Sequence, residues 1–419
     1  MATSTQDMVR PGECVDLYYY DGETSKKQCF ATTVNTRYAQ AFNNLGAGSS
    51  VFTIPPQNGI QDVVLTFTLK PVAGANNGIA LPRGWGYALI KQVSFRYGGS
   101  SQYFLTGDQI LQNALRKQPD LVAADQIFNL GGQILQETDL NSAKNYANVV
   151  LTLPHNSVCS GVGKPHPLPS DLLTQQIQVT VELNDPSSIV INNSGGAFTG
   201  FGSPAQLASA QFQVQQVMLN NQGDALARRV DMAQNAYAYP TEFVQQVQRI
   251  RLVNQADPQE LVLTGFRSGE VKAIHCWLTN NTDLDPTVNQ PFKWYQPDSI
   301  QMTYAGEIFA RFDKGSAVLW NLINGNKVPA VDNIVSVWNA GTGVYDNTAT
   351  LSYWTELPFA QTMVDEDSHS ILVHGKPITN GIVNLTVTPP SASADWVLNV
   401  SYIYNTTLLF SQGTADYVF

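Results

Sequence analysis

The sequence predicts an all-β protein in which one antiparallel domain occurs twice. One reason is a long repeat, because residues 90–116 are matched by the stretch that begins at Ser299. Short segments that alternate apolar and polar residues also recur along the chain, as half-buried strands do. Solenoid repeats have periods of roughly 20–50 residues, so this much longer period indicates a duplicated domain. The aligned pairs are Val93–Ile300, Phe95–Met302, Tyr97–Tyr304 and Gly99–Gly306, then, after one inserted residue, Gly107–Gly315, Leu111–Leu319 and Asn113–Asn321.

The first half contains five clear strand patterns separated by loops rich in Gly, Pro and Asn. Residues 63–70 place Val63, Leu65, Phe67 and Leu69 on one face, because side chains alternate along a strand. The other expected strands are 90–97, 147–154, 176–183, with Ile177, Val179 and Val181 inward, and 211–219. Two helices are expected, over residues 108–117 and 223–232.

The second half repeats this order. Residues 271–278 correspond to 63–70, 351–358 to 147–154, 383–387 to 177–181, and 396–405 to 211–219. Short strands with long loops are typical of antiparallel sandwiches and barrels, and two Greek keys in eight strands give a jelly roll. The predicted fold is therefore two tandem eight-stranded antiparallel jelly rolls with long loops and a few short helices. The expected divisions are an N-terminal arm (1–50), a first roll (51–221), a linker with a short helix (222–236) and a second roll (237–419).

The composition limits the classes of partner. Charged residues make up 13% of the chain, against about 25% in typical soluble domains. A surface so poor in charge is typical of a protein whose surface is largely covered by neighbouring molecules. The alternative is a neutral secreted β protein. The net charge is −10, and basic residues cluster only as the pairs Lys26-Lys27, Arg116-Lys117 and Arg228-Arg229. Because tight contact with a phosphate backbone needs a basic footprint, no direct binding of nucleic acid is expected.

Cysteine usage and the N-terminal region indicate a cytosolic or nuclear site of synthesis. Cys14, Cys29, Cys159 and Cys276 are spread over the chain without CxxC spacing, so we expect reduced thiols. The N-terminal residues lack the apolar core of a secretory signal, and no apolar run approaches the ~18 residues of a membrane span.

No residues are expected to form a catalytic, cofactor or metal site. Residues 160–166 (SGVGKPH) resemble a phosphate loop only in Gly and Lys, so we interpret them as a surface turn. Two groups of residues are weak candidates for metal binding: His155 with Cys159, and the acidic run Asp365, Glu366 and Asp367 beside His369. The remaining histidines are His166, His275 and His374. His275 and Cys276 should point to opposite faces of one strand. Sequons occur at Asn192, Asn280, Asn384, Asn399 and Asn405, and they are expected to be unmodified.

Three stretches resemble the major capsid proteins of large eukaryotic DNA viruses and of polinton-like viruses. Residues 84–111 are similar to that family's first jelly roll, with a strand that leads into the Gly98-Gly99 turn. Residues 213–250 are similar to its domain junction: a last strand, a short charged helix, then a strand over Glu242–Gln248. The end, from Trp396 onward, is similar to its closing strand and tail.

The resemblance implies a non-enzymatic, structural major capsid protein. It would form homotrimers, pseudo-hexameric capsomers that tile the faces of an icosahedral double-stranded DNA virus capsid. The implied partners are neighbouring capsomers, minor capsid or cement proteins and penton proteins, with the N-terminal arm inside the shell near any inner membrane. The expected location is the virion, after synthesis in the host cytoplasm or nucleus.

Three alternatives remain at this point. One is a tandem β-sandwich carbohydrate-binding or host-attachment protein with sugar-binding aromatic loops around Trp294-Tyr295 or Trp338. Another is a minor capsid protein, penton or spike, although those usually carry one roll. The third is an enzyme on a jelly roll, such as a cupin or a glycoside hydrolase. A cupin needs a clustered His/Glu metal set, which the sequence does not show, whereas the paired carboxylates of a hydrolase are not readable from sequence spacing.

Overall fold

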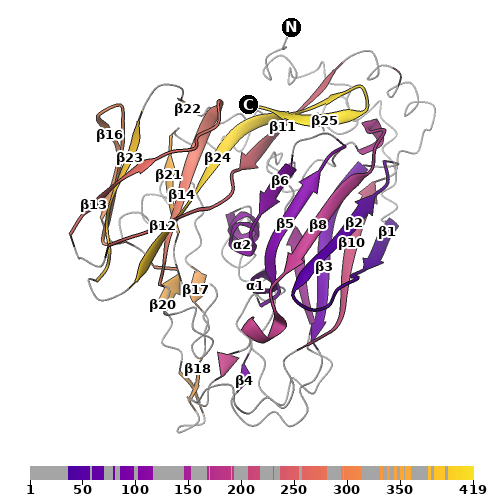
Figure 1. Cartoon of the computed structure of the whole chain (residues 1–419), viewed down its shortest axis with the longest axis horizontal. Helices are drawn as coiled ribbons and strands as arrows, with labels where there is room; N and C mark the ends of the chain where they lie inside the picture. Colours follow the sequence, from indigo (N-terminus) through magenta and orange to yellow (C-terminus); the bar gives the residue numbers. More distant parts are fainter. Residues whose placement is uncertain are drawn as a thin grey trace, which may run out of the picture.

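Two rolls make up the described part of the structure, a computed structural model (Figure 1). Each is built on two sheets of four strands in the same order, and three further strands join one sheet of the second roll. The structure describes residues 36–56, 59–69, 79–80, 85–98, 102–116, 146–151, 168, 170–189, 191–192, 206–217, 230, 236–253, 257–280, 294–295, 297–313, 331–333, 337–339, 344–346, 350–352, 354–359, 376–378, 382–391 and 395–419.

The first roll has two four-stranded antiparallel sheets. One has the order β1 (Thr36–Ala41), β10 (Leu207–Val217), β3 (Gly59–Leu69) and β7 (Tyr146–Leu151). The other has the order β2 (Gly48–Ile54), β8 (Ile177–Leu183), β5 (Ile90–Arg96) and β6 (Gln102–Leu105). Phe52 of β2 stacks on Phe212 of β10 with ring centroids 4.5 Å apart, so the inward faces of the two sheets meet in one core.

The second roll repeats this arrangement. Its first sheet has the order β11 (Tyr237–Val244), β24 (Trp396–Ser411), β14 (Glu270–Asn280) and β21 (Thr355–Pro358). Added to this sheet are β12 (Gln248–Arg251), β22 (Lys376–Pro377) and β25 (Thr414–Val418). Its second sheet has the order β13 (Gln259–Leu263), β23 (Val383–Thr388), β15 (Ser299–Tyr304) and β16 (Glu307–Asp313).

The remaining described elements are short. They are the pairs β4 (Ile79–Ala80) with β9 (Ile191–Asn192), β17 (Val331–Asn333) with β20 (Thr350–Ser352), and β18 (Val337–Asn339) with β19 (Val344–Asp346), the 3-10 turns Ser170–Leu172 and Pro186–Ile189, and the helices α1 (Trp85–Leu89) and α2 (Gly107–Arg116). None of the helices in these parts of the chain has the length and apolar character needed to span a bilayer.

The duplication predicted from the sequence is confirmed strand by strand. Within the first roll Phe95 of β5 pairs with Val179 of β8, and in the second roll its counterpart Met302 of β15 pairs with Leu385 of β23. Every strand pair matched in the sequence occupies the same place in the two sheet orders: β3 and β14, β7 and β21, β8 and β23, β10 and β24. The expected inward residues Val63, Leu65, Phe67 and Leu69 are buried.

One expected boundary differs from the structure. The arm was expected to extend to residue 50, but β1 already pairs with β10 along its whole length, and β2 begins at Gly48. Residues 36–50 therefore belong to the first roll. The expected helix at 108–117 is α2, whereas the expected helix at 223–232 lies almost wholly outside the described residues.

In Figure 1 the β13–β16 sheet is at the left, the sheet of β11, β24 and β14 comes next, and the two sheets of the first roll overlap at the right. Strand β6 and helix α2 are the parts of the first roll nearest the second roll, and this meeting place is the junction between the rolls.

Candidate functional site: the junction between the two rolls

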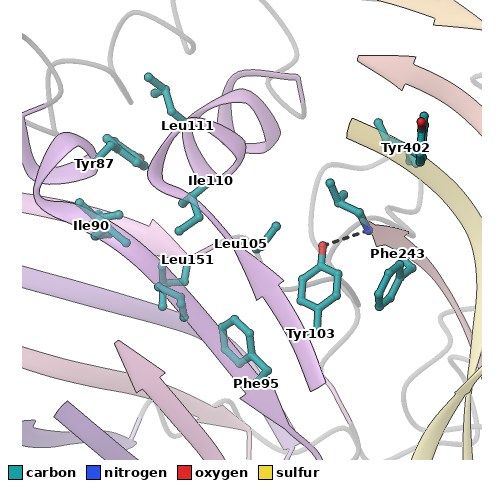
Figure 2. Packing of buried hydrophobic residues seen from close by; sticks show 14 of the residues in the cluster. Tyr87, Ile90, Phe95, Tyr103, Leu105, Ile110, Leu111, Leu151, Phe243 and Tyr402 are labelled. Carbon is teal, nitrogen blue, oxygen red and sulfur yellow. Dashed lines mark hydrogen bonds between the residues drawn. The ribbon is translucent and has the colours of Figure 1, made fainter. Parts of the chain in front are cut away.

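Strand β6 is positioned so that Tyr103 reaches the second roll. Tyr103 pairs with the buried Phe95 in β5, and only 1% of Tyr103 is exposed. The backbone N–H of Val244 in β11 donates to the Tyr103 hydroxyl at 3.3 Å, and the ring lies 5.0 Å from that of Phe243. Figure 2 shows Tyr103 and Phe243 side by side between the two ribbons. One edge strand of the first roll is thus attached to one edge strand of the second.

Aromatic side chains from both rolls form a cluster at this contact. Phe243 lies between the Tyr417 ring, 5.1 Å away, and the Phe419 ring, 5.0 Å away. The Arg267 guanidinium lies over the Phe243 and Phe419 rings at 4.8 and 5.1 Å. The rings of this junction cluster belong to Tyr97, Tyr103, Phe243, Tyr404, Tyr417 and Phe419. Burial raises the pKa of Tyr97 and Tyr417, so these phenols stay neutral.

The C-terminal hairpin of the second roll reaches back to the first roll. Strands β24 and β25 turn at Gln412 and Gly413, both with positive φ, and the Gly413 carbonyl accepts a hydrogen bond from the Thr174 N–H at 2.8 Å. Ala415 N–H donates to the Tyr97 carbonyl at 3.3 Å, and Ala415 forms a parallel bridge with Gly98. The hairpin therefore bonds to the first roll through its backbone as well as through Tyr417.

Helix α2 contributes the third contact. The sequence Thr-x-x-Gln forms a capping box, because Thr106 N–H donates to the Gln109 side chain at 3.0 Å and Gln109 N–H donates to the Thr106 hydroxyl at 3.4 Å. Gln109, 1% exposed, donates its amide to the Gln245 carbonyl at 2.9 Å. At Gly107 a Cβ would strike the carbonyl oxygens of Tyr87 and Ile90, so glycine lets α2 start directly against α1.

Asp108, in the first turn of α2, is the acidic group of the junction. Burial raises its pKa to about 6, while the neighbouring Trp294 side chain and the charge of Arg249 act in the opposite direction. Trp294, in turn, packs on Trp277 of β14 and on Trp354, with ring centroids 6.4 and 5.7 Å apart. The start of α2 therefore lies on a layer of tryptophans that covers the outward face of β14.

The outward face of β14 also contains a buried His–Glu pair. His275 Nε2 lies 3.1 Å from Glu356 Oε2 on the neighbouring strand β21, with both side chains at most 3% exposed. Cys276 points to the opposite face, as expected, and burial raises the pKa of its thiol, which is therefore not a reactive thiolate. Within the described ranges no three His, Cys, Asp or Glu side chains come together as metal ligands would.

The other residues singled out from the sequence fall into two groups. Trp294 is 2% exposed and so offers no open aromatic surface to a sugar, and Tyr295 is half-buried with its ring packed on Trp396 at 4.8 Å. Sequon residue Asn399 is 4% exposed, and its amide donates to Thr279. The second group lies outside the described residues, and it comprises His155, Cys159, residues 160–166 with His166, Asp365, Glu366, Asp367, His369 and His374.

Sequence reasoning predicted no site and missed the junction, although two signals mark it. The Thr106–Gln109 capping box predicts where α2 begins. Residues 36–42 (TRYAQAF) are similar to residues 241–247 (TEFVQQV), and the second copy contains both Phe243 and Gln245. Tyr103 and Val244 are 141 residues apart in the sequence, so no local pattern reveals their contact.

Comparison with solved structures identifies the class of fold. One structural neighbour is VP54 of PBCV-1, in a crystal structure fitted into a reconstruction of the virophage Sputnik. The match has a TM-score of 0.62 at 16% sequence identity, and it covers 92% of this chain and 97% of that chain. The Faustovirus major capsid protein gives a TM-score of 0.55 at 10% identity, over 92% of both chains. The mavirus major capsid protein gives a TM-score of 0.53 at 11% identity, and the match covers 94% of this chain and 93% of that chain.

This chain therefore has the double jelly-roll fold that these viral proteins share. No family model matches the sequence, and no curated protein matches it.

Proposed function

We propose that this chain is a structural major capsid protein, that three copies form a pseudo-hexameric capsomer, and that these capsomers tile the faces of an icosahedral double-stranded DNA virus capsid. The observation that carries the proposal is the junction, which fixes two equivalent rolls side by side in one chain. Three such chains present six similar rolls around a threefold axis, and six similar units pack a flat face without gaps. Solved capsid proteins of the same fold support this reading.

The remaining partners follow from this assignment. The chain would contact neighbouring capsomers, minor capsid or cement proteins and pentons in the virion, and it would act without cofactor or catalysis. The arm before β1 would lie inside the shell, near any inner membrane. A chain of net charge −10 would be separated from the genome rather than bound to it.

The oligomeric state tests the proposal. Native mass spectrometry of the purified protein should give a species of about 137 kDa, three times the chain mass of 45.8 kDa. Each contact in this ring would join the first roll of one chain to the second roll of the next and bury on the order of 2,000 Å² or more, as obligate interfaces do. A stable monomer or dimer at micromolar concentration would contradict the proposal.

A further inference from the structure

Four buried polar side chains at the contact between α2 and the second roll have polar atoms without a hydrogen-bond partner among the described residues. They are Gln112 of α2, Trp277 of β14, Ser401 of β24 and Trp354, which directly precedes β21, and each is 1% exposed. The atoms are both amide atoms of Gln112, the two indole Nε1 atoms and the Ser401 hydroxyl oxygen. Buried polar atoms in folded proteins nearly always have a partner, so a group of exceptions in one contact needs a physical explanation.

The groups from the second roll lie on the outward face of its first sheet. Ser401 pairs directly with His275, and His275 pairs directly with Glu356, so these three side chains form a row across β24, β14 and β21. Trp277 follows His275 by two residues and therefore shares its face. Trp354 belongs to the tryptophan layer that covers this face. The second roll thus presents a hydroxyl and two indole N–H groups to the first roll.

Gln112 lies on the opposite side of this contact. Figure 2 shows Ile110 of α2 pointing into the core of the first roll, where it is fully buried. A residue two positions further along a helix is turned by about 200°, so Gln112 lies on the other side of α2. Asp108 and Gln109, one turn earlier, both have partners in the second roll. The Gln112 amide therefore faces the second roll as well.

Other polar groups of the same layer do have partners. His275 Nε2 lies 3.1 Å from Glu356 Oε2, and the Asn399 amide donates to the Thr279 hydroxyl at 3.0 Å. Gln109 donates to the second roll at 2.9 Å. The unpartnered atoms are therefore not a general property of this face, and they belong to the two surfaces that meet beyond the first turn of α2.

The chemistry of these atoms matches water. Indole N–H groups only donate, so two of them cannot bond to each other. A water molecule can accept from an indole and donate to the Gln112 carbonyl or the Ser401 hydroxyl, and a buried water makes about three such bonds. The carboxyl groups of Asp108 and Glu356 border the same layer, which disfavours an anion and favours a neutral ligand.

We propose that the contact between α2 and the outward face of β14 and β24 is a binding site for ordered water, held by Gln112, Trp277 and Ser401. The junction then has two parts. The part at Tyr103 and Phe243 is aromatic and directly bonded, whereas the part at α2 is hydrated. Bridging water replaces direct hydrogen bonds at small cost, so the hydrated part lets the two rolls adjust their relative orientation while the aromatic part holds them together.

An experimental structure of the full chain at a resolution that shows ordered solvent tests the site. Water oxygens are expected within about 2.7–3.2 Å of the Gln112 amide, the Trp277 Nε1 atom and the Ser401 hydroxyl. A contact without water overturns the proposal, whether the side chains bond to each other directly or stay unpaired.

The sign of a stability change gives a second readout. Gln112→Met keeps the length of the side chain but removes its polar atoms. If water binds the amide, the variant loses those bonds and unfolds at a lower denaturant concentration than the wild-type protein. If the amide is buried dry and unpaired, its removal raises the unfolding midpoint, because an unmet desolvation cost disappears. A raised or unchanged midpoint contradicts the proposal.

Two further variants complete this test. Ser401→Ala should lower the midpoint in the same direction, and it decides the sign if Gln112→Met does not fold. Gln178→Met, at an exposed position of β8, is the matched control and should leave the midpoint unchanged. Both readouts are independent of the oligomeric state, so their failure leaves the capsid proposal standing.

Discussion

Phe95 is a single side chain on which both the first roll and the junction depend. Its ring is 1% exposed and lies 6.5 Å from the Tyr97 ring and 6.4 Å from the Tyr103 ring. Phe95→Ala should lower the free energy of unfolding by about 3–5 kcal/mol, because the cavity forms in a packed core. Lys91→Ala, which removes only an exposed ion pair with Glu182, serves as the control in denaturant unfolding. A loss below about 1 kcal/mol for Phe95→Ala would show that this face does not support the core.

Asp108 should make stability depend on pH. Its carboxyl has a folded-state pKa of about 6 against an ordinary 3.8, so between these values the folded chain holds a proton that the unfolded chain has released. The contribution of this group is therefore most favourable below about pH 3.8 and declines as pH rises towards 6. Asp108→Asn removes this slope and should stabilise the fold at pH 7 by on the order of 1–3 kcal/mol. Unfolding measured at several pH values from 4 to 7 checks this, and parallel curves for the two proteins would contradict it.

At the scale of the element, the contact of β6 with β11 depends on one hydroxyl. Tyr103→Phe keeps the ring against Phe243 but leaves the buried Val244 N–H without its acceptor. The expected loss is about 1–3 kcal/mol, and Tyr103→Ala, which also removes the ring, should lose more. Denaturant unfolding of the two variants should give this order. Wild-type stability in Tyr103→Phe would mean that the hydroxyl does not hold the junction.

Strands were predictable from the sequence because burial of one face imposes a two-residue period on them. Val63, Leu65, Phe67 and Leu69 show this in β3, and the repeat then located their counterparts in the second roll. Strand β1 was missed because its Thr, Arg, Tyr and Gln residues lack that apolar period, and only its pairing with β10 makes it a strand. The capping box at Thr106 and the similarity of residues 36–42 to 241–247 mark elements of the junction, but the pairing between them could not be predicted, since its contacts join Tyr103 to residues 140 and more positions away.

On the scale of the whole molecule, the charge distribution predicts that the protein does not bind DNA tightly. With a net charge of −10 and no basic run, the protein has no counterion release to drive binding. A filter-binding assay at ~0.15 M salt should show no tight complex with double-stranded DNA. Submicromolar binding under these conditions would contradict the proposed separation of shell and genome.

The C-terminal hairpin has a consequence for how the protein is made. A ribosome adds about 5–20 residues per second, so roughly 15–60 s pass between the synthesis of Tyr103 and that of Tyr417. During that interval the first roll has emerged, but its Tyr97–Gly98 edge lacks the partners that Ala415 and Tyr417 later supply. A chain that terminates before the hairpin therefore leaves this aromatic edge without its cover. The junction therefore closes last, and its closure distinguishes a finished chain from a fragment.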